Sequence, residues 1–460
     1  MQEAAAFMQV FDSTKTTISR KEFQHRILDL STSVDISRVY PIAMSMLLVG
    51  SSVGIITPIM PFLVESLSLT SGEYGMVVSG FALAKMMANI PAAILVERHG
   101  RKPYLVHSFW LLAGSVGFMG LPNQSMEGLI LCRLATGTGV AALSTAATMT
   151  IADLSTPRNR ASTMAPTMSA FAAGTALGPA IGGYLGDLLG VHATFYAVGL
   201  SYLGLGLLNH HLQKETQPRR TIDNIDFPWN APSDRKYTND AEQKTVMASA
   251  QEAVNQWSPL MKNPTVRNVT IMTGFYWFAL AGSQMTLLPL ILTDSDGMNM
   301  SPISMGQVYM GMSMVQVLGN PLMAKFVDAN LKKGRAVLLG CSLLSLSMAA
   351  LPYCHYEDHI SLPATLGLWS LGSTILSTAP VAQVTQVVPE EKRAQALALL
   401  RTCGDLGFFM GATSIGAMAD WTGNLHISMQ ASAGILLTAT AWFGMRQAVE
   451  ASLTNKSTTS

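Results

Sequence analysis

The chain has 460 residues, of which 49% are hydrophobic and only 12% are charged, against about 25% charged in an ordinary soluble domain. Its formal net charge of +1 provides no global field for nucleic acid, so no nucleic-acid partner is expected. The four cysteines are scattered without a paired spacing, which argues against a zinc site or a disulfide framework; no metal and no cofactor are predicted.

Residues 1–39 predict a cytoplasmic N-terminal tail. They lack the continuous apolar core of a signal peptide, and their acidic residues argue against a transit peptide. Residues 20–30 fit an amphipathic helix lying on the inner membrane surface, and a disordered tail fits equally well.

Beyond this tail, apolar runs long enough to span a bilayer as helices recur along the chain. We expect an all-α integral membrane protein with twelve transmembrane helices in two six-helix bundles, residues 40–212 and 265–447. Residues 213–264 form a cytoplasmic linker between the bundles, and 448–460 form a cytoplasmic tail. The expected spans are 40–64, 73–96, 104–121, 127–152, 162–186, 191–212, 266–292, 302–327, 335–354, 361–387, 394–419 and 427–447.

The loops between these spans separate by charge. If both termini are cytoplasmic, the six outer loops contain no Lys or Arg and carry acidic residues instead. The inner loops hold the basic residues, as the positive-inside rule requires, so the rule places both termini in the cytoplasm.

The first span contains two prolines three residues apart, Pro58 and Pro61, which remove backbone donors and kink a helix, making room for a cavity. With Gly54 they resemble the G/D-xxx-P-xx-P pattern of the drug:proton antiporter branch of the major facilitator superfamily. Some members of that branch carry Asp where this chain has Gly54, so no proton site is expected there.

The stretch LVERHGRK at 95–102 forms a strongly basic turn between the second and third spans. It resembles the G-x-L-x-D-R-x-G-R-[KR] loop between helices 2 and 3 of major facilitator superfamily transporters. Glu97 replaces the Asp of that motif and Ala93 replaces its first Gly, while the matching residues are Leu95, Arg98, Gly100, Arg101 and Lys102.

The resemblance implies a gate at this loop. Glu97 is expected to pair with basic residues across the loop and with the positive N-terminus of the eleventh span near Arg393, latching the halves together on the cytoplasmic side. Asp328 belongs to a degraded copy of the motif after the eighth span, KFVDANLKKGR, and is included in the gate. The alternative is that the basic residues only keep the loop on the cytoplasmic side of the membrane.

Two further motifs match the same superfamily. Residues 133–141, from Arg133 onward, resemble its R-xxx-G-x-G-x-A helix 4 pattern; no strand precedes them, which excludes a dinucleotide fingerprint. The fifth span resembles the G-xxx-G-P-xx-G-G signature of antiporters, in which glycines four apart give a flat face for helix contact. This packing motif consists of Gly174, Gly178, Pro179, Gly182 and Gly183.

The two halves also resemble each other. Arg160 precedes Asp187 by 27 residues across the fifth span, and Arg393 precedes Asp420 by the same 27 across the eleventh. Internal symmetry of this kind is typical of secondary transporters, whose substrate sites lie near the bilayer midplane.

Few charges fall inside the spans, and a charge there is costly unless it is paired or hydrated. Arg401 and Asp405 lie four residues apart on one face of the eleventh span, where they are able to pair. One hypothesis is that Asp405 binds the coupling proton, while Arg401, Arg133 or Lys85 sets its affinity. The alternative is a static Arg401–Asp405 ion pair that holds the helix to a neighbour.

Other polar or aromatic side chains in the spans are candidates to line a substrate cavity, although each also fits an interhelical hydrogen bond. With Pro58 and Pro61, the candidates are Asn89, Tyr276, Trp277, Gln284, Gln307, Gln316 and Gln383.

The sequence therefore predicts a monomeric carrier, not an enzyme, that exports a small organic molecule by alternating access with proton coupling. A uniporter or proton symporter that imports a metabolite is the first alternative, and a transport-inactive membrane receptor or scaffold is the second.

Overall fold

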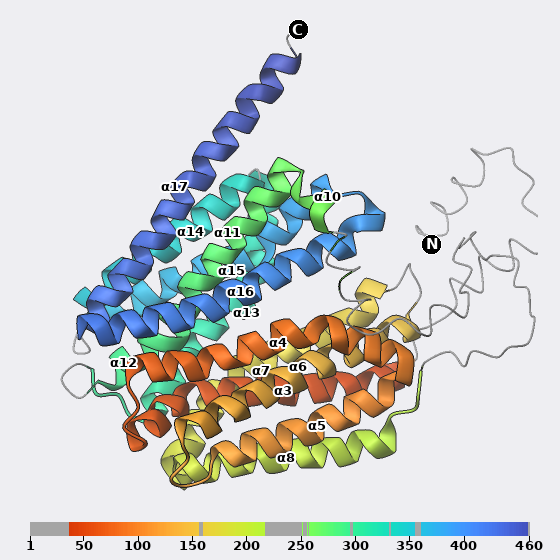
Figure 1. Cartoon of the computed structure of the whole chain (residues 1–460), viewed down its shortest axis with the longest axis vertical. Coiled ribbons are helices and arrows are strands. Elements are labelled where there is room, and N and C mark those ends of the chain that lie inside the picture. Colours follow the sequence, from red (N-terminus) through yellow and green to blue (C-terminus); the bar gives the residue numbers. More distant parts are fainter. Residues whose placement is uncertain are drawn as a thin grey trace, which may run out of the picture.

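The computed structural model describes residues 36–155, 160–216, 251, 255, 257–294, 298–330, 333–354 and 360–458. The expected amphipathic helix at 20–30 lies outside these residues, as does most of the linker. The described residues are arranged as two helical halves (Figure 1).

The first half contains six helices, one for each apolar run expected there. In this half α3 packs against α7, α4 against α6, and α5 against α8. The helices are α3 (Ile36–Ser66), α4 (Ser71–His99), α5 (Arg101–Met119), α6 (Met126–Leu154), α7 (Arg160–Leu189) and α8 (Val191–Leu212).

The second half begins with a short helix, α10 (Trp257–Met261), followed by a rod of three consecutive segments. The rod consists of α11 (Pro264–Leu280), the π-helix η2 (Ala281–Leu287) and α12 (Leu288–Thr293). The remaining elements are α13 (Pro302–Asn330), α14 (Lys333–Ala350), the 3-10 turn η3 (Leu351–Tyr353), α15 (Ser361–Val387), α16 (Glu390–Thr422) and α17 (Leu425–Thr458).

Length and hydropathy are sufficient for a membrane crossing in six of the described segments, and each of these overlaps an expected span. They are Val39–Ser66, Ser71–His99, Met126–Leu154, Val191–Leu212, Pro264–Thr293 and Gly334–Tyr353.

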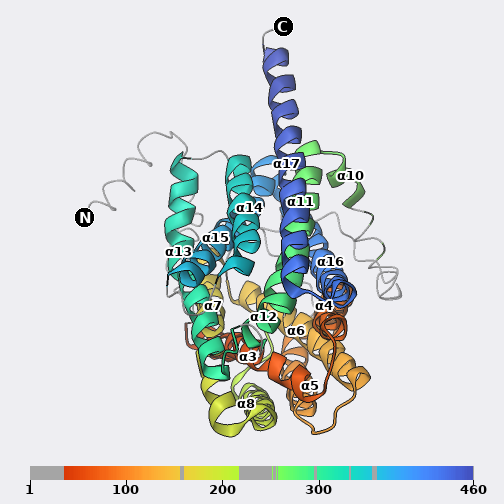
Figure 2. The same cartoon turned by 90° about the vertical axis from the view of Figure 1, so that its left-hand side faces the viewer.

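The last helix is longer than expected. The sequence predicts that the twelfth span ends at 447 and is followed by a tail, whereas α17 continues to Thr458 (Figure 2). Neither Gly nor Pro occurs between 448 and 458, so nothing in the sequence stops the helix there. The Glu450 carboxylate also accepts hydrogen bonds from Asn268 Nδ2 (2.6 Å) and Thr265 Oγ1 (3.2 Å), which fix this turn to α11.

Each half has its own apolar core. The core of the first half includes Phe109 and Phe195, and that of the second includes Trp369 and Phe443, all almost fully buried. Separate cores allow each half to move as a unit relative to the other.

Glycines on α7 bring its backbone against α3. A methyl group on Gly174 would overlap the carbonyl oxygen of Leu47, and one on Gly178 would overlap that of Ser51. Gly182 lies against Ile55 in the same way, so the fifth-span motif forms the flat contact face that glycines four apart allow.

The halves meet mainly through two pairs of helices, α4 with α16 and α7 with α13. Gly75 lies against Ala412 and Gly416, and Gly183 lies against Pro302 and Gly306. Gly183 and Gly416 each precede by four residues the Asp of the 27-residue repeat, so the two contacts occupy equivalent places in the halves.

These glycine contacts lie at one end of the molecule. We call the end where α8 finishes and α11 begins the linker end, and the opposite end, which includes residues 67–70, the far end. At the far end the Asp420 carboxylate accepts a hydrogen bond from the Gly72 N–H (2.9 Å) at the start of α4. Figure 1 shows α4 and α16 close together at the far end, on the left, and diverging toward the linker end.

The α3–α7 contact gives a stability prediction. Gly178→Leu would force a side chain into the backbone of Ser51 and Gly54, and overpacking of this kind costs about 1–3 kcal/mol or more. We expect the Tm of the detergent-solubilised protein to fall by several degrees. Gly204→Leu on α8 is the matched control, because no neighbouring atom lies within 4 Å of an added Cβ there. Equal Tm values for the two variants would contradict the packing account.

Candidate functional site

A charged contact joins the two halves midway along their helices. Lys85 Nζ on α4 lies 2.7 Å from Asp405 Oδ1 on α16, and the two side chains are 24% and 13% exposed. An ammonium–carboxylate contact at this distance is a charge-assisted hydrogen bond, and partial burial strengthens it relative to an exposed pair.

The second oxygen of Asp405 is also held by α4. Asn89, one helical turn beyond Lys85, donates from Nδ2 to Asp405 Oδ2 over 3.2 Å. Asn89 is a predicted cavity residue and Lys85 a predicted charge partner of Asp405, and the structure brings both to one carboxylate. Asp405 therefore ties α16 to α4 through both of its oxygens.

The static Arg401–Asp405 ion pair, which the sequence left as an alternative, is not observed among the described residues. Arg401 is exposed, and within the described chain the ion pair of Asp405 is formed with Lys85. The four-residue spacing places Arg401 and Asp405 on one side of α16, but the carboxylate turns toward two donors on α4 instead.

Arg133 on α6 also contacts α4. Its Nε donates to the carbonyl of Val77 (3.4 Å), and its guanidinium lies 5.2 Å from the centroid of the Phe81 ring. Val77, Phe81, Lys85 and Asn89 follow one another at four-residue intervals, so one stripe of α4 carries both charged contacts.

The α16 backbone around Asp405 is fixed by close packing against α11. Gly407 lies against Gly274, and Gly404 lies against the indole of Trp277, which would be 2.7 Å from an added Cβ. The Trp277 ring also lies 6.2 Å from that of Phe408, between centroids. Trp277, predicted as a cavity residue, thus packs beside the residue that precedes Asp405.

The predicted cavity residue Gln284 serves as an interhelical hydrogen-bond partner. Its side-chain oxygen accepts from the Trp369 indole N–H (3.1 Å), and its backbone carbonyl accepts from the Tyr309 hydroxyl (3.1 Å). Gln284 lies in η2, which sequence reasoning did not predict. Pro289 was the available signal, because its ring clashes with the carbonyl four residues earlier in a regular α-helix, and a π-turn relieves such a clash.

The remaining cavity candidates differ in burial. Pro58 and Pro61 are buried within α3, and Tyr276 is buried in the core of the second half. Gln316 and Gln383 are half-buried, whereas Gln307 is exposed.

The gate residues lie mostly at helix ends. Glu97 and Arg98 belong to the last turn of α4, while Arg101 and Lys102 begin α5, so the expected multi-residue turn is Gly100 alone. Gly100 has φ 108° and ψ 163°, a conformation that only glycine adopts readily, which is why the turn is so short.

Two acidic residues that sequence reasoning missed hold this junction. Arg101 Nε lies 3.0 Å from Asp153 Oδ2 on α6, and the backbone N–H groups of Arg101 and Lys102 donate to the Glu215 carboxylate (3.0 and 3.1 Å). A carboxylate at a helix N-terminus satisfies donors that have no partner within the helix. The side chain of Asp328 lies outside the described residues, and the latch between Glu97 and the region of Arg393 stays a prediction.

Comparison with known proteins adds an independent finding. A family profile described as Major Facilitator Superfamily matches residues 42–412. An uncharacterized MFS-type transporter of Methanocaldococcus jannaschii is 25% identical over 372 residues, which cover 81% of this chain and 88% of that protein.

Solved structures show the same arrangement of helices. The nucleoside transporter NupG, as a variant, has a TM-score of 0.69 at 12% identity, covering 90% of this chain and 100% of that chain. A bacterial homolog of the human lysosomal transporter Spinster, inward-facing and occupied, has a TM-score of 0.68 at 17% identity, covering 89% and 96%. At these identities the likeness concerns the fold alone.

The Lys85–Asp405 pair gives a prediction that does not depend on any substrate. Lys85→Met leaves a carboxylate without its cation, and with the observed partial exposure we expect a loss of about 2–3 kcal/mol. Lys85→Met/Asp405→Asn removes both charges and should recover most of the lost Tm in detergent. If the double variant is as unstable as the single one, the pair does not connect the halves as described.

Proposed function

The chain belongs to the Major Facilitator Superfamily, and on that premise we propose that it is a secondary transporter of a small organic molecule, working by alternating access with proton coupling. The family membership makes the chain a multi-pass integral membrane transporter rather than an enzyme. The chain is therefore embedded in a lipid bilayer, and members of its family transport small molecules.

The observation that supports coupling is the contact of Asp405 with Lys85 and Asn89. It joins one helix of each half midway along their length, where the two halves must move past each other if access alternates. A charge in such a place is expensive to maintain, which favours a functional role.

The proposed coupling step is a protonation. A proton from water forms an O–H bond with the Asp405 carboxylate and removes its negative charge, while Lys85 keeps its own positive charge. The ion pair becomes a weaker contact between an ammonium and a neutral acid, so α4 and α16 separate more easily. Release of the proton restores the pair. In this proposal Arg133 and Arg401 tune the proton affinity of Asp405.

The arrangement of the helix ends supports alternating access. Glycine contacts and the Asp420–Gly72 hydrogen bond close the far end, while α4 and α16 diverge at the linker end. We assign this arrangement to the state that is open toward the linker end. In the opposite state the Glu97 region and the Arg393 region approach each other and form the proposed latch.

Two finer features complete the proposal, and one alternative mode remains to be separated from it. The absence of basic residues from the outer loops supports cytoplasmic termini, so the linker end faces the cytoplasm. The helix 1 and helix 5 motifs support export by antiport. Proton symport or uniport of a metabolite uses the same fold, and counterflow with and without a protonophore separates these modes.

Asp405→Asn tests the coupling step after a substrate screen in proteoliposomes under an imposed pH gradient. The amide has nearly the same shape but does not take up the proton, so accumulation driven by the gradient should fall to background while exchange persists. Asp187→Asn, an exposed residue at the far end of α7, is the control. Accumulation with a normal pH profile in Asp405→Asn would overturn the proton site, and absence of flux in the unaltered protein would favour a transport-inactive receptor.

Glu97→Gln tests the latch separately. Loss of this charge should slow net transport several-fold without changing the pH dependence set by Asp405, because closure of the cytoplasmic end becomes less favourable. Initial rates of substrate flux at several pH values provide the measurement. Unchanged rates would leave the loop only its topogenic role.

A further inference from the structure

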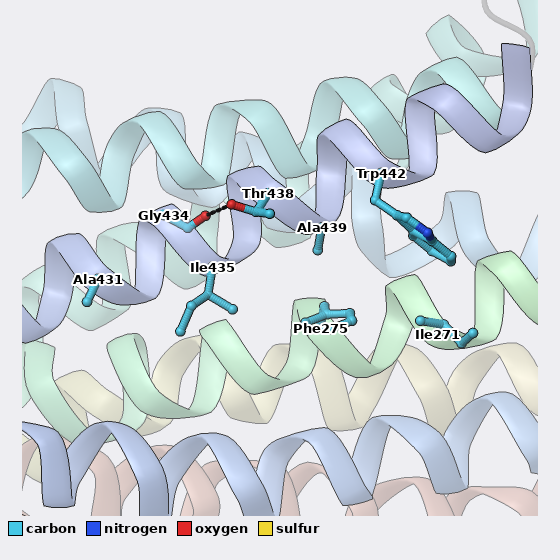
Figure 3. Close-up of a pocket in the computed structure, with 8 residues that line it drawn as sticks. All are labelled: Ile271, Phe275, Ala431, Gly434, Ile435, Thr438, Ala439 and Trp442. Carbon is cyan, nitrogen blue, oxygen red and sulfur yellow. Dashed lines mark hydrogen bonds between the residues drawn. The ribbon is translucent and has the colours of Figure 1, made fainter.

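An apolar groove of about 670 Å³ lies between α11 and α17 in the second half (Figure 3). Ile271 and Phe275 of α11 line one side, and Ile435, Ala439 and Trp442 of α17 line the other. None of the proposed coupling or cavity residues contributes to it. The groove is therefore separate from the Lys85–Asp405 site.

The lining offers almost no hydrogen-bonding groups. The hydroxyl of Thr438 donates to the carbonyl of Gly434 (2.8 Å), as Figure 3 shows, so its proton is already used within α17. Phe275 and Ile435 remain 39% and 36% exposed, so the groove opens to the outside of the second half. In a membrane-spanning protein this surface contacts hydrocarbon, and the chemistry favours an apolar, flexible occupant.

Two guanidinium groups lie beyond the same end of the groove. Arg267 is one helical turn before Ile271 on α11, and Arg446 is one turn after Trp442 on α17; both are exposed. The Arg446 guanidinium lies 5.9 Å from the centroid of the Trp442 ring, which holds it over the groove's wall. Both cations are at the linker end, where α11 begins.

The helices are joined behind these cations. Glu450, the nearest acidic residue along α17, directs its two oxygens to Asn268 and Thr265 of α11. Both oxygens of the Glu450 carboxylate therefore accept hydrogen bonds from side chains of α11. Within the described part of the chain, neither Arg267 nor Arg446 forms an ion pair with it.

We propose that the groove binds an acyl chain of an anionic phospholipid, with the lipid phosphate held by Arg267 and Arg446. Ala431 to Trp442 extends about 17 Å at 1.5 Å per residue, roughly half the hydrocarbon thickness of a bilayer, a length comparable to that of one acyl chain. Basic residues between helices at a membrane surface attract anionic head groups. A second copy packed here about a two-fold axis along the membrane normal would bring four guanidinium groups to one level, which disfavours that occupant.

The inference depends on the membrane location of the chain and not on the proposed substrate or coupling. Failure of the proton-coupling proposal would leave it unaffected.

Native mass spectrometry of the purified full chain, titrated with phosphatidylglycerol or phosphatidylcholine, tests the site. Gly434→Leu fills the groove without a clash, because no atom lies within 4 Å of an added Cβ, and should weaken binding of the first phosphatidylglycerol at least about tenfold. Gly367→Leu on α15 is equally free of neighbours and serves as the control. Ala431→Phe fills the same groove and is used if Gly434→Leu does not fold.

The charge requirement is tested in the same titration. Arg267→Gln/Arg446→Gln should remove the preference for phosphatidylglycerol over phosphatidylcholine, whereas Arg335→Gln, an exposed residue on α14, should retain it. Unchanged lipid binding in both groove-filling variants overturns the groove site. A preference for phosphatidylglycerol that survives loss of both arginines overturns the anionic head-group assignment. If the unaltered chain forms dimers and Gly434→Leu converts them to monomers, the occupant of the groove is a second copy of the chain.

Discussion

Contact between glycine backbones is the constraint on which the rest of the structure depends. Glycines on α7 admit α3 on one side and α13 on the other, and Gly75 and Gly416 do the same for α4 and α16. Without side chains between them, these helices approach closely enough for polar groups to meet across the halves. The Lys85–Asp405 pair and the Asp420–Gly72 hydrogen bond both lie on the α4–α16 contact that glycine creates.

That contact also explains why a charged pair is tolerated in an otherwise apolar interior. Asp405 has two oxygens and α4 supplies a donor to each, so the cost of burial is offset by hydrogen bonds on both. The tight packing of Gly404 and Gly407 on α11 fixes the position of the α16 backbone that carries this carboxylate. The interaction is strong while its geometry lasts and is lost over a small displacement, which is what the proposed movement of the two halves requires.

The sequence predicted the helices well because hydropathy and loop charge are local properties. It also singled out Asp405, since a carboxylate within an apolar run stands out. It left the partner of Asp405 open among Arg401, Arg133 and Lys85, because the four-residue rule describes only one helix and Lys85 is 320 positions away in the chain. Asp153 and Glu215 were missed for the same reason. The groove between α11 and α17 was invisible because Ile271 or Ile435 looks the same in a sequence whether it faces a neighbouring helix, a lipid or a cavity.

The one-residue junction at Gly100 has a mechanical consequence. A longer loop would let α4 and α5 move independently, but here the end of one helix is covalently the start of the next. Arg101 binds Asp153 and thereby adds the end of α6 to the same assembly. The ends of α4, α5 and α6 are therefore fixed to one another. A tilt of α4 at the interface between the halves would tilt α5 and α6 with it. An insertion of a few flexible residues after Gly100 would leave every helix intact, yet a tilt of α4 would no longer be passed on to α5.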